Sequence, residues 1–114
     1  MLDTSPLSAA VERFADRLRA APQSRLQQGA AAVALELARE LSVRAQGLEA
    51  PGAAPREMPD AGIFVVGDQV AVAGRDLAEA LRGGPGAPGS AKAPSEILDE
   101  AVALVERAEI RATR

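Results

Sequence analysis

The chain has 114 residues, a length that predicts one small domain over residues 1–114. Its formal net charge is −3. It contains no cysteine, histidine, tryptophan or tyrosine. These absences exclude a disulfide, a Cys/His zinc site, a thiol nucleophile and an imidazole base. The acidic balance disfavours a nucleic-acid surface, and we expect neither a cofactor nor a metal.

The N-terminal residues lack the basic region and apolar core of a signal peptide. The longest strongly apolar run covers residues 30–35, which is far too short to span a bilayer. We therefore expect a soluble cytoplasmic protein that has no membrane partner.

The first predicted helix begins at Thr4 or Ser5, with Pro6 in its first turn, where proline is tolerated. Pro22 ends it, because a residue before proline avoids the helical region. Apolar residues recur along it at intervals of four, three and four, which predicts one buried stripe. This stripe consists of Leu7, Val11, Phe14 and Leu18.

A second predicted helix begins at Ser24, where Gln27 completes a capping box, and runs to about Gln46 before Gly47. It is apolar around more than half of its circumference, which indicates partners on two sides. Only about three residues join it to the first helix. This short connection predicts an antiparallel helical hairpin.

A stiff loop rich in proline follows over residues 49–62, and a β-hairpin is predicted over residues 63–73. Gly67-Asp68 lies between two β-rich runs, as in a tight two-residue turn. Both faces of that hairpin would be apolar, and an isolated two-stranded ribbon is marginal in water. The hairpin therefore needs cover from helices or from a second copy of the chain.

The remaining sequence predicts a short helix, a linker and a last helix. Asp76 and Glu79 form a second capping box that opens the short helix, which ends near Arg82. Residues 83–94 are rich in glycine and proline and predict an internal flexible linker. The last helix runs over residues 94–111 and carries a broad apolar face.

The predicted fold class is mostly α (α+β), with a helical hairpin, one β-hairpin, a short helix and a C-terminal helix. The surplus of apolar faces predicts an intertwined or isologous homodimer. The expected interface residues are Ile63, Phe64, Val65, Val70, Val72, Ile97 and Leu104. The leading hypothesis is a non-catalytic protein-interaction or structural module that acts as this homodimer, with another protein as a possible partner.

Two alternatives stay open. Residues 37–48 resemble a helix-turn-helix whose wing would be the hairpin, although Ser42 stands where the turn often has glycine. The acidic charge of the chain argues against nucleic acid as its partner. Asp60, Asp68 and Asp76, with Arg75, could form a carboxylate site for a small ligand or an enzyme. Residues 84–92 match a phosphate-binding loop poorly, because Lys92 is displaced from the motif.

Overall fold

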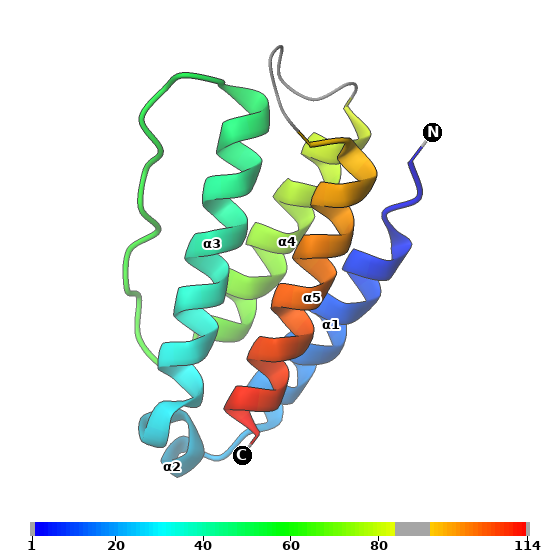
Figure 1. The fold of residues 1–114 in the computed structure, drawn as a ribbon. Coiled ribbons are helices and arrows are strands. Elements are labelled where there is room, and N and C mark those ends of the chain that lie inside the picture. Colours follow the sequence, from blue (N-terminus) through cyan, green and yellow to red (C-terminus); the bar gives the residue numbers. More distant parts are fainter. Residues whose placement is uncertain (1, 84–91, 114) are drawn as a thin grey trace.

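The computed structural model describes residues 2–83 and 92–113, which form a bundle of four long helices (Figure 1). A three-residue helix, α2, and a π-helical segment, η1, lead from the first long helix into the second. The elements are α1 (Ser5–Ala20), α2 (Gln23–Arg25), η1 (Leu26–Ala30), α3 (Ala31–Glu49), α4 (Val66–Arg82) and α5 (Pro94–Ala112).

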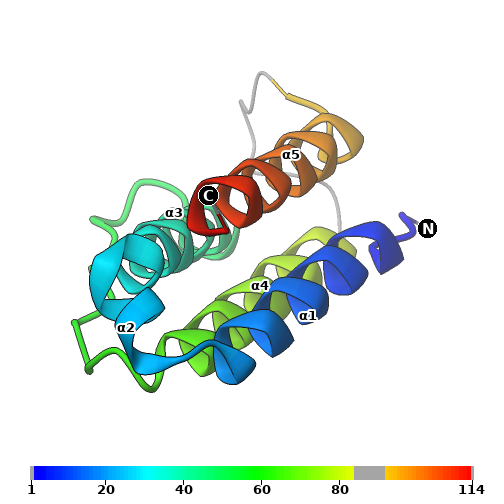
Figure 2. The same ribbon diagram turned by 90° about the horizontal axis from the view of Figure 1, so that it is seen from below.

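The bundle places α1 beside α4 and α5, and α3 beside the same two helices, so α1 and α3 lie on a diagonal (Figure 2). The predicted helical hairpin of the first two helices is therefore wrong. A short connection usually makes two helices neighbours. Here α2 and η1 carry the chain across one end of the bundle, so that α3 starts on the opposite side.

Two glycines explain why α1 packs on α4. A Cβ atom added to Gly74 would lie 2.6 Å from Cγ2 of Val11, and one added to Gly67 would lie 3.1 Å from the carbonyl oxygen of Ala15. The two glycines are seven residues apart, which places them on one face of α4, two turns from each other. Their missing side chains let the backbone of α4 approach α1 closely.

The predicted β-hairpin over residues 63–73 is wrong, and the described residues contain no strand. Gly67 and Asp68 lie in the first turn of α4, where an acidic side chain favours a helix. Buried residues recur along α4 with helical spacing, which the turn-like Gly-Asp pair concealed. Asp76 and Glu79 lie inside α4 and open no helix. The buried stripe includes Val66, Val70, Ala73, Leu77 and Leu81.

The other boundaries agree in part with the expectation. The first and last predicted helices are confirmed as α1 and α5. The second helix is interrupted at Gly29, whose φ of +142° is outside the helical region, and it makes no side-chain cap at its start. Gly47 lies inside α3 rather than ending it. Most of the predicted linker, residues 84–91, lies outside the described part of the chain.

Polar contacts tie α1 to its two neighbours. Glu109 of α5 is almost fully buried, and its carboxylate pairs with Arg13 and Arg17 of α1 at 3.2 Å each. At the other end of the bundle, Nη1 of Arg82 donates a hydrogen bond to the buried hydroxyl of Thr4 at 2.6 Å. No helix in the described residues is both long and apolar enough to cross a membrane.

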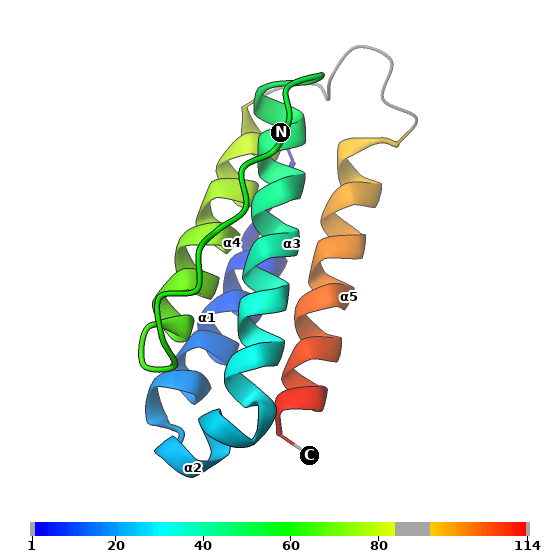
Figure 3. The same cartoon turned by 90° about the vertical axis from the view of Figure 1, so that its left-hand side faces the viewer.

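An extended crossover joins α3 to α4, and we call residues 50–65 the strap. Because α3 and α4 run in the same direction, the chain must return along the whole bundle before α4 begins (Figure 3). Pro51, Pro55 and Pro59 stiffen this return, as the sequence predicted for a loop in this region. The strap lies over the outer side of α3 and α4.

Candidate functional site

A groove of 880 Å³ lies between α3, η1 and the strap, and we call it the strap groove. This volume lies within the usual range for ligand pockets. Its lining is largely apolar, and ten of the seventeen lining residues come from α3 and η1. The apolar side chains are Leu26, Leu35, Val43, Ile63 and Val66, with Ala31, Ala32 and Pro55.

Gln46 of α3 holds the middle of the strap by binding the main chain of Arg56. Its Nε2 donates to the carbonyl oxygen of Arg56 at 2.9 Å, and its Oε1 accepts from the amide of Arg56 at 2.8 Å. One side-chain amide thus satisfies both main-chain groups of one residue, as a neighbouring β-strand would. This contact does not depend on the side chain at position 56.

Arg39 and Gln69 hold the strap in the same way. Nε of Arg39 donates to the carbonyl oxygen of Met58, and Nε2 of Gln69 donates to that of Pro59, at 2.8 and 2.9 Å. Residues 54–61 make no backbone–backbone hydrogen bond in the described structure. The hydrogen bonds that position the strap on the bundle therefore come from three helix side chains, which we call the latch residues: Arg39, Gln46 and Gln69.

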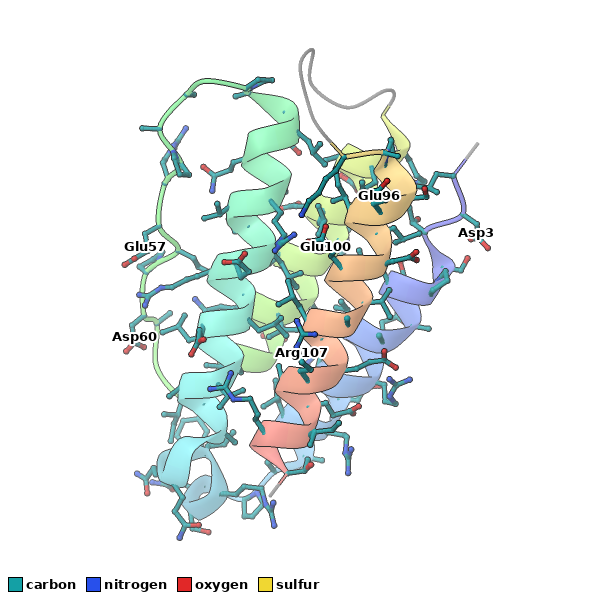
Figure 4. The ribbon with its side chains drawn as sticks, in the orientation of Figure 1. Asp3, Glu57, Asp60, Glu96, Glu100 and Arg107 are labelled. Atoms are coloured by element: carbon teal, nitrogen blue, oxygen red, sulfur yellow. The ribbon has the colours of Figure 1, made fainter. Side chains whose placement is uncertain are left out.

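The rim of the strap groove carries more acidic than basic side chains. The carboxylates of Glu57 and Asp60 project from the strap on the side away from α3 (Figure 4). Glu36 and Glu40 lie on the α3 side, whereas Arg39 and Arg56 are the two basic residues. Arg39 is bound to the strap and to Glu57. Of these two basic residues, only Arg56 has a guanidinium group without a partner among the described residues.

Arginines outside the groove pair with two of these carboxylates. Arg44 lies 3.1 Å from Glu40, and Arg111 lies 3.8 Å from Glu36. Pairs between exposed side chains contribute little free energy, and both carboxylates stay accessible to water. The rim therefore keeps an acidic surface, although its net local field is weaker than four carboxylates would give.

Arg44 also connects the groove rim to α5 through Glu100, which faces α3 (Figure 4). Glu100 accepts a 2.7 Å hydrogen bond from Nζ of Lys92 and lies 3.7 Å from Nη1 of Arg44. The hydrogen bond from Lys92 is the main reason that the pKa of Glu100 lies below its ordinary value, and partial desolvation opposes the shift. The ionised carboxylate is thus favoured by folding.

Replacing Glu100 with glutamine is expected to flatten the loss of stability in acid. A carboxyl group whose pKa is lowered by folding stabilises the protein above its unfolded pKa, and this contribution disappears as the pH falls through the folded pKa. Urea midpoints from about pH 5 down to about pH 3 should fall less steeply in Glu100→Gln than in the wild type. Glu106→Gln, an exposed change on the same helix, is the control. An unchanged slope in Glu100→Gln would contradict the assignment.

The structure separates the residues predicted to form an interface. Val70 and Ile97 lie in the core of the single chain, and neither needs a second copy for its burial. Ile63, Val65 and Leu104 are half-buried. Only Phe64, which is 72% exposed, and Val72 present large apolar surface to solvent.

The two alternative sites do not assemble in the described residues. Helix α3 continues through residues 37–48, so the helix-turn-helix has no turn at Ser42, and its wing is absent. Asp68 accepts hydrogen bonds from Arg19, whereas Asp60 accepts one from the amide of Gly62. Asp76 lies exposed on α4, about 12 Å along the helix from Asp68.

The sequence did not identify the latch residues. Gln69 lies in the segment predicted as a hairpin with apolar faces, and its isolated amide was the available signal. Gln46 lies where the second predicted helix ends, and Arg39 lies inside that helix, where nothing in the sequence sets it apart. Their role depends on how the strap lies on the bundle, which no local pattern encodes.

No histidine, cysteine, aspartate or glutamate group of three or more in the described residues could hold a metal ion. Comparison of the chain with models of known protein families, with curated proteins and with solved structures found no match. The strap groove is therefore interpreted from its own geometry and chemistry.

Proposed function

We propose that the chain is a non-catalytic protein-interaction module whose strap groove receives an apolar, lysine- or arginine-bearing helical segment of another protein. The observation that carries this proposal is the combination of an apolar floor with an acidic rim in the strap groove. An amphipathic helix in a groove is a recurring mode of recognition, in which apolar anchors supply affinity. Rim charges then select the partner and speed its association.

A dye-labelled amphipathic helix of about 14 residues, made of leucine and lysine, is the test peptide. The matched control is a peptide in which glutamate replaces every lysine. Fluorescence anisotropy should show that the lysine peptide binds at least about tenfold more tightly than the glutamate peptide at low salt. Equal affinities, or no binding of either peptide, would contradict the proposal.

Two pairs of variants locate the binding site. Replacing the four rim carboxylates by Glu36→Gln, Glu40→Gln, Glu57→Gln and Asp60→Asn should weaken binding of the lysine peptide. The matched control removes four exposed carboxylates elsewhere, by Glu12→Gln, Glu79→Gln, Glu106→Gln and Asp99→Asn. Val43→Ser, inside the groove, should also weaken binding, whereas Val72→Ser, on the outer face of α4, should not. Equal losses in a variant and its control would place the peptide outside the groove.

Self-association, which we expected from the sequence, stays a prediction. Its main argument was that an apolar hairpin needs cover, and the described residues form no hairpin. The large apolar side chains that are exposed in the single chain lie on four different segments, on α3, before α4, on α4 and on α5. They are Val43, Phe64, Val72 and Ile110. A light-scattering mass of twice 11.7 kDa would support the homodimer.

A further inference from the structure

We infer that the strap is a movable cover, which swings about Gly52 and Gly62 and is held shut by the three latch residues. Opening the strap controls how much of the groove a partner helix can enter. This inference rests on the proposed function, because it concerns access to the same groove. It assigns the strap a regulatory role beyond its connection of α3 to α4.

The backbone of the strap has the pattern of a stiff rod between two pivots. Gly52 and Gly62 have φ angles of +84° and +101°, in a region that other residues rarely adopt. Nothing lies within 4 Å of the Cβ position of either glycine, so no neighbouring side chain packs against the two pivots. Between them, Pro55 and Pro59 restrict the chain to an extended shape.

The contacts that hold the rod are few and do not form a packed interface. Main-chain groups of Arg56, Met58 and Pro59 bind the latch residues, and Glu57 pairs with Arg39 at 3.4 Å. Met58 is the only residue between the pivots that is partly buried. Regions with few buried apolar contacts and exposed hydrogen bonds are those that open locally. The strap is therefore the segment of the described structure best suited to move while the four helices stay packed.

The closed position also leaves one polar atom unsatisfied. Oε1 of Gln69 is buried and has no hydrogen-bond partner in the described residues, while the Nε2 of the same amide binds Pro59. A buried acceptor without a donor costs free energy, and opening the strap would give this oxygen access to water. Gln69 therefore both holds the strap and makes its closed state less favourable.

The position of the strap gives the reason for opening. The groove is bounded by α3 and η1 on one side and by the strap on the other. A helix is about 10 Å wide, so a partner helix can lie deeper against α3 only if the strap moves outward. The latch contacts oppose that movement.

Releasing the latch should increase both strap motion and peptide affinity. The release variant, Gln46→Ala with Gln69→Ala, removes two of the three latch residues and keeps Arg39, which lines the groove. Its matched control is Gln23→Ala with Gln28→Ala, which removes two exposed side-chain amides that make no hydrogen bond in the described structure. Because the chain has no cysteine, Ala54→Cys carries the only attachment site for a spin label on the strap. The label should become more mobile in the release variant, and the lysine peptide should bind about tenfold more tightly, because closed protein no longer competes.

A second experiment prevents opening. Gln46→Cys with Arg56→Cys, joined by a short bis-maleimide, ties the strap to α3 and should weaken binding of the lysine peptide. Unchanged label mobility in the release variant would show that Gln46 and Gln69 do not hold the strap, and it would overturn the proposed latch. A mobile label with unchanged or weaker binding, or full binding to the tied protein, would show that the strap is a fixed wall while the proposed function stands. A mobile label with no binding by any variant would instead overturn the proposed function, and the regulatory role with it.

Discussion

Replacing Phe14 with alanine is expected to lower the free energy of unfolding by about 3–5 kcal/mol, the range found for large core aromatics. Phe14 lies on α1 at the centre of the bundle, and its side chain is 1% exposed. Alanine would leave a cavity among side chains of several helices, which cannot close without moving a whole helix. Urea denaturation followed by circular dichroism measures the loss.

The only other aromatic residue gives the control for this experiment. Phe64 precedes α4 and is largely exposed, so Phe64→Ala should change stability by no more than about 0.5 kcal/mol. In the predicted hairpin, the side chain of Phe64 was part of an apolar face that needed cover. A loss at Phe64 as large as that at Phe14 would therefore contradict the helical arrangement and favour a covered position for Phe64.

Replacing Gly74 with alanine is expected to destabilise the protein by about 1–3 kcal/mol, the usual cost of overpacking a core. The change gains helix propensity, but the new Cβ would lie 2.6 Å from Cγ2 and 2.7 Å from Cγ1 of Val11. Neither atom belongs to a flexible chain end, so α1 and α4 must separate. The midpoint of urea unfolding should fall.

Gly47 provides a matched control, because it lies inside α3 with nothing within 4 Å of its Cβ position. Gly47→Ala should stabilise the protein by about 0.5–1 kcal/mol through helix propensity alone. Val11→Ala should restore much of the stability lost in Gly74→Ala, and a double-mutant cycle measures that coupling. If the effects of the two changes simply add, the close approach of α1 and α4 is not the reason for the glycine.

The sequence predicted those helices whose apolar spacing agreed with their end signals. In α1, Pro6 and Pro22 mark the two ends of the stripe, and in α5 the stripe follows Pro94. In α4 the two kinds of signal disagree, because Gly67-Asp68 is typical of a tight turn while Val66, Val70 and their successors have helical spacing. The structure follows the helical spacing. Gly67 does not form a turn but allows close packing against Ala15.

The pairing of the helices and the site could not be predicted from local patterns. Helices that follow each other in sequence usually pack together, but α1 packs on α4 because Gly67 and Gly74 let the two helices approach closely. This effect depends on α1 lying opposite the two glycines. The stiffness of residues 49–62 was visible in their prolines. The groove beneath them was not, because it depends on Arg39, Gln46 and Gln69 reaching main-chain atoms that lie 10–19 residues away in sequence.

The diagonal placement of α1 and α3 has a consequence for biosynthesis. When α1 and α3 have emerged from the ribosome, neither has its packing partner, because α4 and α5 have not yet been made. The apolar stripe of α1 therefore stays exposed until about residue 82 has been translated, and contacts between such distant segments form slowly. The nascent N-terminal half is accordingly the part of this chain with the greatest need of a chaperone.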